Sequence, residues 1–187
     1  MAKTIVLYYS ATGTTKAIAE YIAQQLGADL HAVQAAQPYT STDLNWHDTS
    51  TRATVEQHQH NSRVAIKDDL PDLADYDNVV IGHPIWWGIP PRLVATLIDQ
   101  LDLNGKHVAL FATSGGSTYE RSQSFVERTI KENGYEVTLN EGAVLNSPAR
   151  VDQWLPRQNF KKIKNTIGVG IPILSCLKCQ LLVASVR

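Results

Sequence analysis

The chain of 187 residues has only two cysteines, Cys176 and Cys179, and both lie among its last dozen residues. This scarcity excludes a fold held together by a disulfide framework. The chain also carries little net charge, since 17 basic and 18 acidic side chains give a formal net charge of −1. The charge therefore gives no reason to expect nucleic acid or an acidic membrane as a partner. No basic segment followed by an apolar run opens the chain, as a secretory signal would require. The sequence therefore predicts a cytoplasmic protein.

What is present is a regular alternation of apolar strands and helical stripes. Five strands are predicted, at Thr4–Tyr9, Asp29–Val33, Val79–Gly82, His107–Thr113 and Glu136–Leu145. Apolar residues at helical spacing lie between them, around Ile18, Leu97 and Ile130, and a last helix is predicted from Val151 to about Lys164. Several strands are continuous apolar runs, which is typical of parallel strands covered on both faces. The pattern predicts a three-layer α/β/α sandwich around a doubly wound parallel sheet.

Two segments depart from this alternation. Residues 39–64 are polar apart from Trp46, so we expect a long irregular insertion that acts as a lid or has no fixed structure. Its histidines, at 47, 58 and 60, are interpreted as a solvated loop rather than as a metal site. Residues 165–187 form an apolar extension after a single domain over residues 1–164. Three interpretations of it are open: a redox cysteine pair, a membrane anchor, and a non-native or frame-shifted extension after the last helix. The third is favoured, because the predicted fold is complete without these residues.

A loop rich in hydroxyl groups follows the first predicted strand. Its candidate ligand-binding residues are Ser10, Thr12, Gly13, Thr14 and Thr15, and a helix begins directly after them. Free backbone N–H groups and the partial positive charge of a helix N-terminus make such a turn an anion site, most often for phosphate. The loop therefore predicts a phosphorylated ligand, held without a cationic side chain.

Two further loops follow the third and fourth predicted strands, at the same edge of the sheet. The second loop contains Pro84, Ile85, Trp86, Trp87 and Gly88, and the third contains Thr113, Ser114, Gly115, Gly116 and Ser117. Adjacent tryptophans on a loop stiffened by proline suit stacking on a flat ring, while glycines and hydroxyls allow close approach and hydrogen bonding. An alternative in which the tryptophans only pack against the end of the sheet stays open. Together, the three loops predict a planar molecule with a phosphate tail.

Taken together, these three loops resemble those of the flavodoxin-like FMN-binding family, in particular a bacterial branch with Pro-Ile-Trp-Trp in the second loop. The resemblance spans roughly residues 3–160. It implies a five-stranded sheet of order 2-1-3-4-5 and non-covalent FMN. By this resemblance, the first loop holds the phosphate, and the second and third loops lie on either side of the isoalloxazine ring. The chain departs from the family in its near-neutral charge, its insertion and its apolar extension.

Competing folds lack their catalytic groups in this chain. The first loop has neither the acidic cluster of a response regulator nor the cysteine of a low-molecular-weight phosphatase, and neither Gly-x-Ser-x-Gly nor Gly-Lys-Ser/Thr occurs. We therefore expect a redox protein in which FMN mediates electron transfer to a partner protein. The alternative is an NAD(P)H-dependent FMN oxidoreductase acting on quinones or similar acceptors, and a binding module without redox activity is the third possibility.

Overall fold

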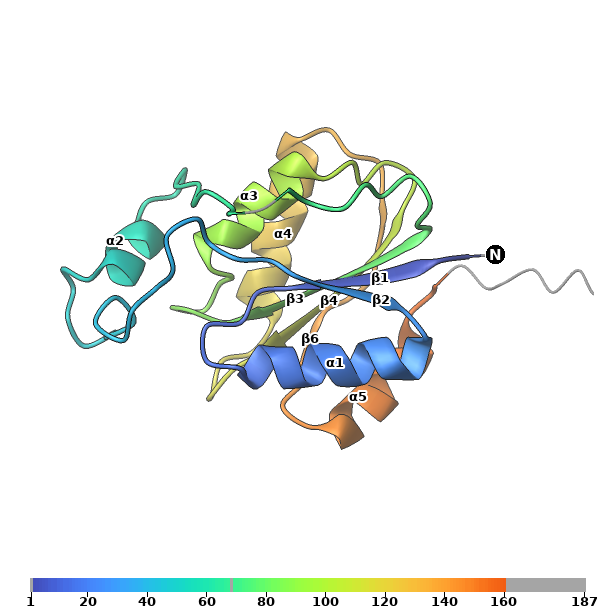
Figure 1. The fold of residues 1–187 in the computed structure, drawn as a ribbon, viewed down its shortest axis with the longest axis horizontal. Coiled ribbons are helices and arrows are strands. Elements are labelled where there is room, and N and C mark those ends of the chain that lie inside the picture. The colour runs from blue at the N-terminus through green and yellow to red at the C-terminus, as the bar shows by residue number, and fades with distance from the viewer. Residues whose placement is uncertain (1, 68, 161–187) are drawn as a thin grey trace, which may run out of the picture.

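The computed structural model describes residues 2–67 and 69–160, which form a sheet covered by helices on both faces (Figure 1). Its strands are β1 (Thr4–Tyr8), β2 (Asp29–Ala32), β3 (Asn78–Pro84), β4 (His107–Thr113), β5 (Thr138–Leu139) and β6 (Ala143–Val144). Its helices are α1 (Thr14–Leu26), α2 (Arg52–His58), α3 (Arg92–Gln100), α4 (Glu120–Glu132) and α5 (Pro148–Trp154), followed by the 3₁₀ turn η1 (Leu155–Arg157). The expected three-layer architecture is confirmed.

The sheet is parallel throughout, with the strand order β2-β1-β3-β4-β5. The apolar runs of β1, β3 and β4 occupy its centre, because strands covered on both faces leave no position for a solvated side chain. Gly82 in β3 is required by packing, since a Cβ atom there would lie 2.1 Å from the Phe111 ring of β4. The strand order 2-1-3-4-5 implied by the sequence resemblance is confirmed by the pairing of these strands.

The fifth predicted strand is divided into two short pieces. β5 pairs with the start of β4 and β6 with its end, so β6 is a sixth strand outside the linear order. Between them, Gly142 donates its N–H to the Gln123 side chain, and the Tyr119 ring occupies the space that a Cβ atom on Gly142 would need. The strand is thus interrupted where Tyr119, the residue before α4, and Gln123 of α4 contact Gly142.

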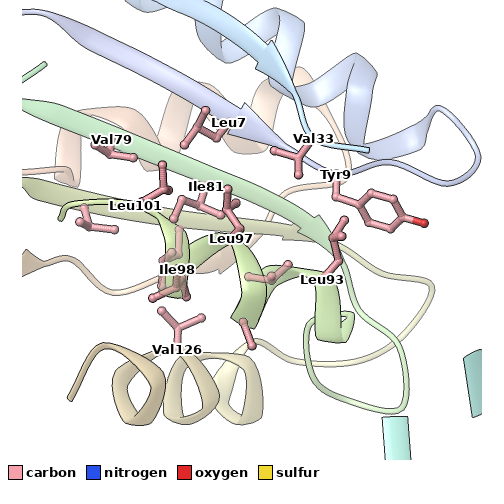
Figure 2. Close-up of a cluster of buried hydrophobic side chains, with 14 of the residues drawn as sticks. Leu7, Tyr9, Val33, Val79, Ile81, Leu93, Leu97, Ile98, Leu101 and Val126 are labelled. Carbon is pink, nitrogen blue, oxygen red and sulfur yellow. The ribbon is translucent and has the colours of Figure 1, made fainter. Parts of the chain in front are cut away.

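Two apolar cores lie on opposite faces of the sheet. One lies under α3 and α4, and Figure 2 shows its centre, where Leu97 and Ile98 of α3 meet Ile81 of β3 and Val126 of α4. The other lies under α1 and α5. Truncation of a fully buried leucine such as Leu97 to alanine costs about 2–5 kcal/mol. This packing fixes the strand ends from which the three loops emerge.

Two sequence-based expectations need correction. The insertion at residues 39–64 is not irregular throughout, because it contains α2, which lies beyond the carboxyl ends of the central strands (Figure 1). The last helix begins at Pro148 instead of Val151 and ends at Trp154, where the tighter turn η1 follows. Among the helices of the described residues, none has the length and apolar content needed to cross a bilayer. The apolar extension, with Cys176 and Cys179, lies outside the described residues.

Candidate functional site

A cavity of about 650 Å³ opens at the carboxyl ends of β1, β3 and β4. All three predicted loops line it, and the predicted residues in its wall are Thr12, Thr14, Thr15, Pro84, Ile85, Trp86, Trp87, Thr113, Ser114 and Gly115. Its volume falls within the range of small-molecule and cofactor sites, about 300–1,000 Å³. We call it the rim cavity. The structure thus brings together in one wall the three loops that were predicted to share one edge of the sheet.

The first loop delivers an uncapped helix N-terminus to this rim. Gly13 precedes α1 with φ +92°, a left-handed conformation that favours glycine, and no side chain caps the helix. The first turn of α1 also carries no acidic residue that would repel an anion. The Gly13 N–H donates to the Ser10 hydroxyl at 3.1 Å, which holds the loop in its turn. These features create a positive helix end bordered by the hydroxyls of Thr12 and Thr14.

Hydrogen bonds connect the third loop to the first. The Thr15 and Thr113 hydroxyls lie 2.8 Å apart in a buried position. Asn146 holds the third loop by donating to the Ser114 carbonyl at 2.7 Å and accepting the Ser114 N–H at 3.1 Å. The Ser114 hydroxyl in turn accepts the N–H groups of Gly116 and Ser117. The polar side of the cavity is therefore preorganised before any ligand arrives.

The second loop makes a tight turn that presents its tryptophans. Trp86 and Ile89 exchange backbone hydrogen bonds at 2.9 and 3.2 Å, with Trp87 and Gly88 between them. Their φ values of +51° and +85° are the pattern of a type I′ turn, and Trp87 is the only residue other than glycine with a positive φ in the described chain. The strain of placing tryptophan there, about 1–2 kcal/mol, is tolerated at a position that lines the cavity.

Trp86 belongs to an aromatic cluster that fixes its orientation. Its ring meets those of Tyr39 and Tyr9 edge to face, with centroids 5.1 and 5.9 Å away. Burial raises the pKa of both tyrosines above their usual value, so both stay neutral at physiological pH. Tyr39 comes from the insertion and also donates to Glu56 of α2. The insertion is therefore part of the support of the second loop.

A reciprocal pair of side chains attaches α2 to the same loop. The Gln57 amide donates to the carbonyls of Trp86 and Pro90, at 2.9 and 3.1 Å, and accepts the Arg92 N–H at 3.1 Å. The Arg92 guanidinium donates back to the carbonyls of Glu56, Gln57 and His60, at 2.6–3.3 Å. The Gln57 carbonyl lies in the last turn of α2, where a helix leaves carbonyl groups without an intrahelical partner, so the arginine supplies a donor there. We call this pair the Gln57–Arg92 brace.

Some predicted residues do not reach the rim cavity. Ser10 and Gly13 line a neighbouring cavity of about 450 Å³ on the other side of the first loop. Gly88, Gly116 and Ser117 line neither of these two cavities. Five residues that line the rim cavity were not among the ligand-binding residues predicted from the sequence: Ala11, Leu44, Trp46, Ala53 and Asn146. Trp46 was noted in the sequence as the large apolar residue of the insertion, whereas the other four carry no signal that could have separated them from surface or packing residues.

The chemistry of the wall fits an amphipathic ligand. None of the residues that line the rim cavity is charged, so an anion there is held by O–H and N–H donors. The first and third loops and Asn146 contribute hydroxyls and an amide, and the second loop contributes tryptophan, isoleucine and proline. Beneath the site, burial lowers the pKa of His83 to about 4, and the neutral ring donates from Nδ1 to the Pro84 carbonyl. In residues 2–67 and 69–160, no group of three metal-ligating side chains is present. A flat ring with an anionic tail fits this donor set.

Comparisons with known proteins agree with this geometry. A family model described as Flavodoxin matches residues 3–158. A solved structure from Bacteroides eggerthii is 39% identical, with a TM-score of 0.79 over 86% of this chain and 100% of the other. A flavoprotein from Lactobacillus acidophilus, solved in complex with FMN, is 31% identical, with a TM-score of 0.63 over 83% of this chain and 99% of its own.

The curated relatives include an enzyme. An NAD(P)H dehydrogenase (quinone) from Cupriavidus metallidurans is 26% identical over 144 residues, which cover 74% of this chain. The chain spans only 63% of that relative's length. The family match covers most of the chain, and the fold and the rim cavity agree with it: the chain belongs to the flavodoxin family.

Proposed function

We propose that this protein binds FMN non-covalently in the rim cavity and transfers electrons through it to a redox partner. The observation that carries the proposal is that one cavity is lined both by hydroxyls beside a helix N-terminus and by the tryptophans of the second loop. The FMN complex of the Lactobacillus acidophilus flavoprotein supports the choice of flavin. FMN, when bound, supplies the redox chemistry, so no side chain has to act as acid, base or nucleophile.

In this proposal each of the three loops binds a different part of FMN. The phosphate lies at the N-terminus of α1 against Thr12, Thr14 and Thr15, with Ser10 and Gly13 shaping the turn. The ring lies against the second loop, from Pro84 to Gly88, and the third loop, from Thr113 to Ser117, borders its other side. We also assign the chain to the bacterial branch with Pro-Ile-Trp-Trp and place it in the cytoplasm, on its motif and its cysteine content.

A spectroscopic titration tests FMN binding. Adding FMN to the flavin-free protein should quench the fluorescence of the flavin and shift its visible spectrum, with saturation at one FMN per chain. Replacing Trp86 with alanine should weaken binding, because the aromatic side of the cavity is lost. Replacing Trp154, which is buried under the opposite face, with phenylalanine is the control and should leave affinity unchanged. Failure of the unmodified protein to bind FMN contradicts the proposal.

The second candidate function is an NAD(P)H-dependent FMN oxidoreductase that acts on quinones or similar acceptors. One observation favours it: the insertion adds Leu44, Trp46 and Ala53 to the wall of the rim cavity, and Trp46 is 66% exposed there. An exposed aromatic beside the ring site offers a surface for a flat acceptor. Anaerobic addition of NADPH to the FMN-loaded protein separates the candidates. Prompt loss of the yellow colour supports the enzyme, and an unchanged spectrum supports the electron carrier.

A further inference from the structure

A second cavity adjoins the rim cavity. It has a volume of about 690 Å³ and lies between α2 and α4, and Trp87 lines both cavities. Its walls are a mixture of apolar side chains, among them Phe125 and Ile89, and basic ones. The second cavity therefore shares Trp87, a residue of the proposed ring site, with the wall of the rim cavity. Its concave shape and its volume suit a small molecule more than the flat surface of a protein.

The charge of this cavity is opposite to that of the whole chain. Three arginines line it against a single carboxylate, which leaves a formal charge of +2 with its two histidines neutral, whereas the entire chain carries −1. The charged and titratable residues in the wall are Arg92, Arg121, Arg128, Glu120, His58 and His60. Because like charges repel, three guanidinium groups that share one cavity with a single carboxylate raise the energy of the empty site. An anion would lower it.

The three arginines differ in how many of their guanidinium N–H groups already form hydrogen bonds or ion pairs within the protein. Arg92 is 2% exposed and donates to backbone carbonyls in the Gln57–Arg92 brace. Arg128 makes an exposed contact of 3.6 Å to Glu132 on its own helix, a pair of the kind that contributes about 0.3–0.5 kcal/mol. Arg121 forms no hydrogen bond or ion pair within the described part of the chain. Its Nη1 lies 2.6 Å from the place of a Cβ on Gly88, so its guanidinium lies over the second loop.

We propose that this basic cavity is an anion subsite for a phosphate-bearing redox partner of the flavin, and we assign it to the pyrophosphate of a nicotinamide dinucleotide. Arg121 and Arg128 supply the forked donors that match phosphate oxygens, and Arg92 adds positive charge from below. The inference rests on the proposed function, because a ligand in this cavity can exchange electrons with the protein only if FMN is bound in the adjoining rim cavity.

Calorimetric titration of the full-length, FMN-loaded protein tests the inference. The probes are NADP⁺, which cannot reduce the flavin, and inorganic pyrophosphate. We expect both to bind and to compete, with NADP⁺ the tighter ligand, and we expect Arg121→Gln and Arg128→Gln each to weaken both by about tenfold. Arg150→Gln is the matched control, since Arg150 is exposed on α5 at the opposite face and should have no effect.

Three results would overturn the inference. They are no binding of either probe to the FMN-loaded protein, an equal loss in Arg150→Gln, or pyrophosphate binding that NADP⁺ does not displace. The flavin spectrum of each variant is recorded in parallel. A protein that takes up FMN but binds neither probe contradicts the anion subsite alone, whereas one that never takes up FMN contradicts the proposed function. Titration of pyrophosphate into flavin-free protein still reports on the arginines in that second case.

Discussion

The Gln57–Arg92 brace offers a direct test of how the insertion supports the second loop. Gln57 is 5% exposed, and its amide makes three hydrogen bonds to backbone groups at both ends of that loop. A methionine at this position fills a similar volume and makes none of them. Each lost hydrogen bond costs about 1 kcal/mol, and more where a buried group is left unpaired, so Gln57→Met should lower the free energy of unfolding by about 3 kcal/mol. The Arg92 side chain keeps its bonds, because it donates to backbone carbonyls.

Urea denaturation of the full chain, followed by circular dichroism, measures this loss, and thermal melting should show a drop of about 6–12 °C. Gln59→Met is the matched control: Gln59 is exposed at the end of α2, so its replacement should change the free energy by less than about 0.5 kcal/mol. Gln57→Ala should cost more than Gln57→Met because it also leaves a cavity. A loss below about 1 kcal/mol in Gln57→Met would refute the brace.

Three further predictions concern single residues, and one concerns the extension. Thr15→Val removes the buried hydroxyl pair with Thr113 and should cost about 1–2 kcal/mol in urea denaturation; no loss would contradict the link between the loops. Gly88→Ala should cost about 1–2 kcal/mol because φ is +85°, whereas Gly115→Ala, with open space around it, should be near neutral; equal losses would count against the strained turn. Burial lowers the pKa of His83 to about 4 from its ordinary 6.5. The stability that the neutral His83 ring contributes to the folded state is therefore complete above pH 6.5 and is lost as the pH falls toward 4. As the pH falls between 6.5 and 4, the free energy of unfolding should decrease more steeply in the unmodified protein than in His83→Gln, by about 1.4 kcal/mol per pH unit. Parallel plots of this free energy against pH would refute the prediction. Deletion of residues 167–187 should leave FMN affinity unchanged, and a large loss would show that the extension contributes to the site.

The fold and the three loops could be predicted because their signals are local and strong. Continuous apolar runs mark β1, β3 and β4, and topology alone then puts the loops after them at one edge. The interruption between β5 and β6 could not be predicted, since it depends on where the Tyr119 ring of a distant segment packs.

Helix α2 shows a different limit. Its buried face consists of Ala53, Thr54 and Gln57, so it has no apolar stripe at helical spacing, although it supplies both a wall residue and the brace. Arg121 shows a third limit of prediction from sequence. Its long side chain reaches from α4 to the second loop, and nothing in the order of residues along the helix indicates that contact. Polar burial and long-range reach are tertiary effects, which hydrophobic periodicity does not register.

In the proposed FMN site, hydroxyls and backbone N–H groups at the start of α1 hold the phosphate, and the tryptophan loop holds the ring. A parallel titration of the flavin-free protein with FMN and with riboflavin, which lacks the phosphate, tests it most directly. FMN should bind at least about a hundredfold more tightly, which corresponds to the loss of two charge-assisted hydrogen bonds in riboflavin. The double variant Thr12→Val, Thr14→Val should remove most of this difference. Equal affinity for the two flavins would contradict it.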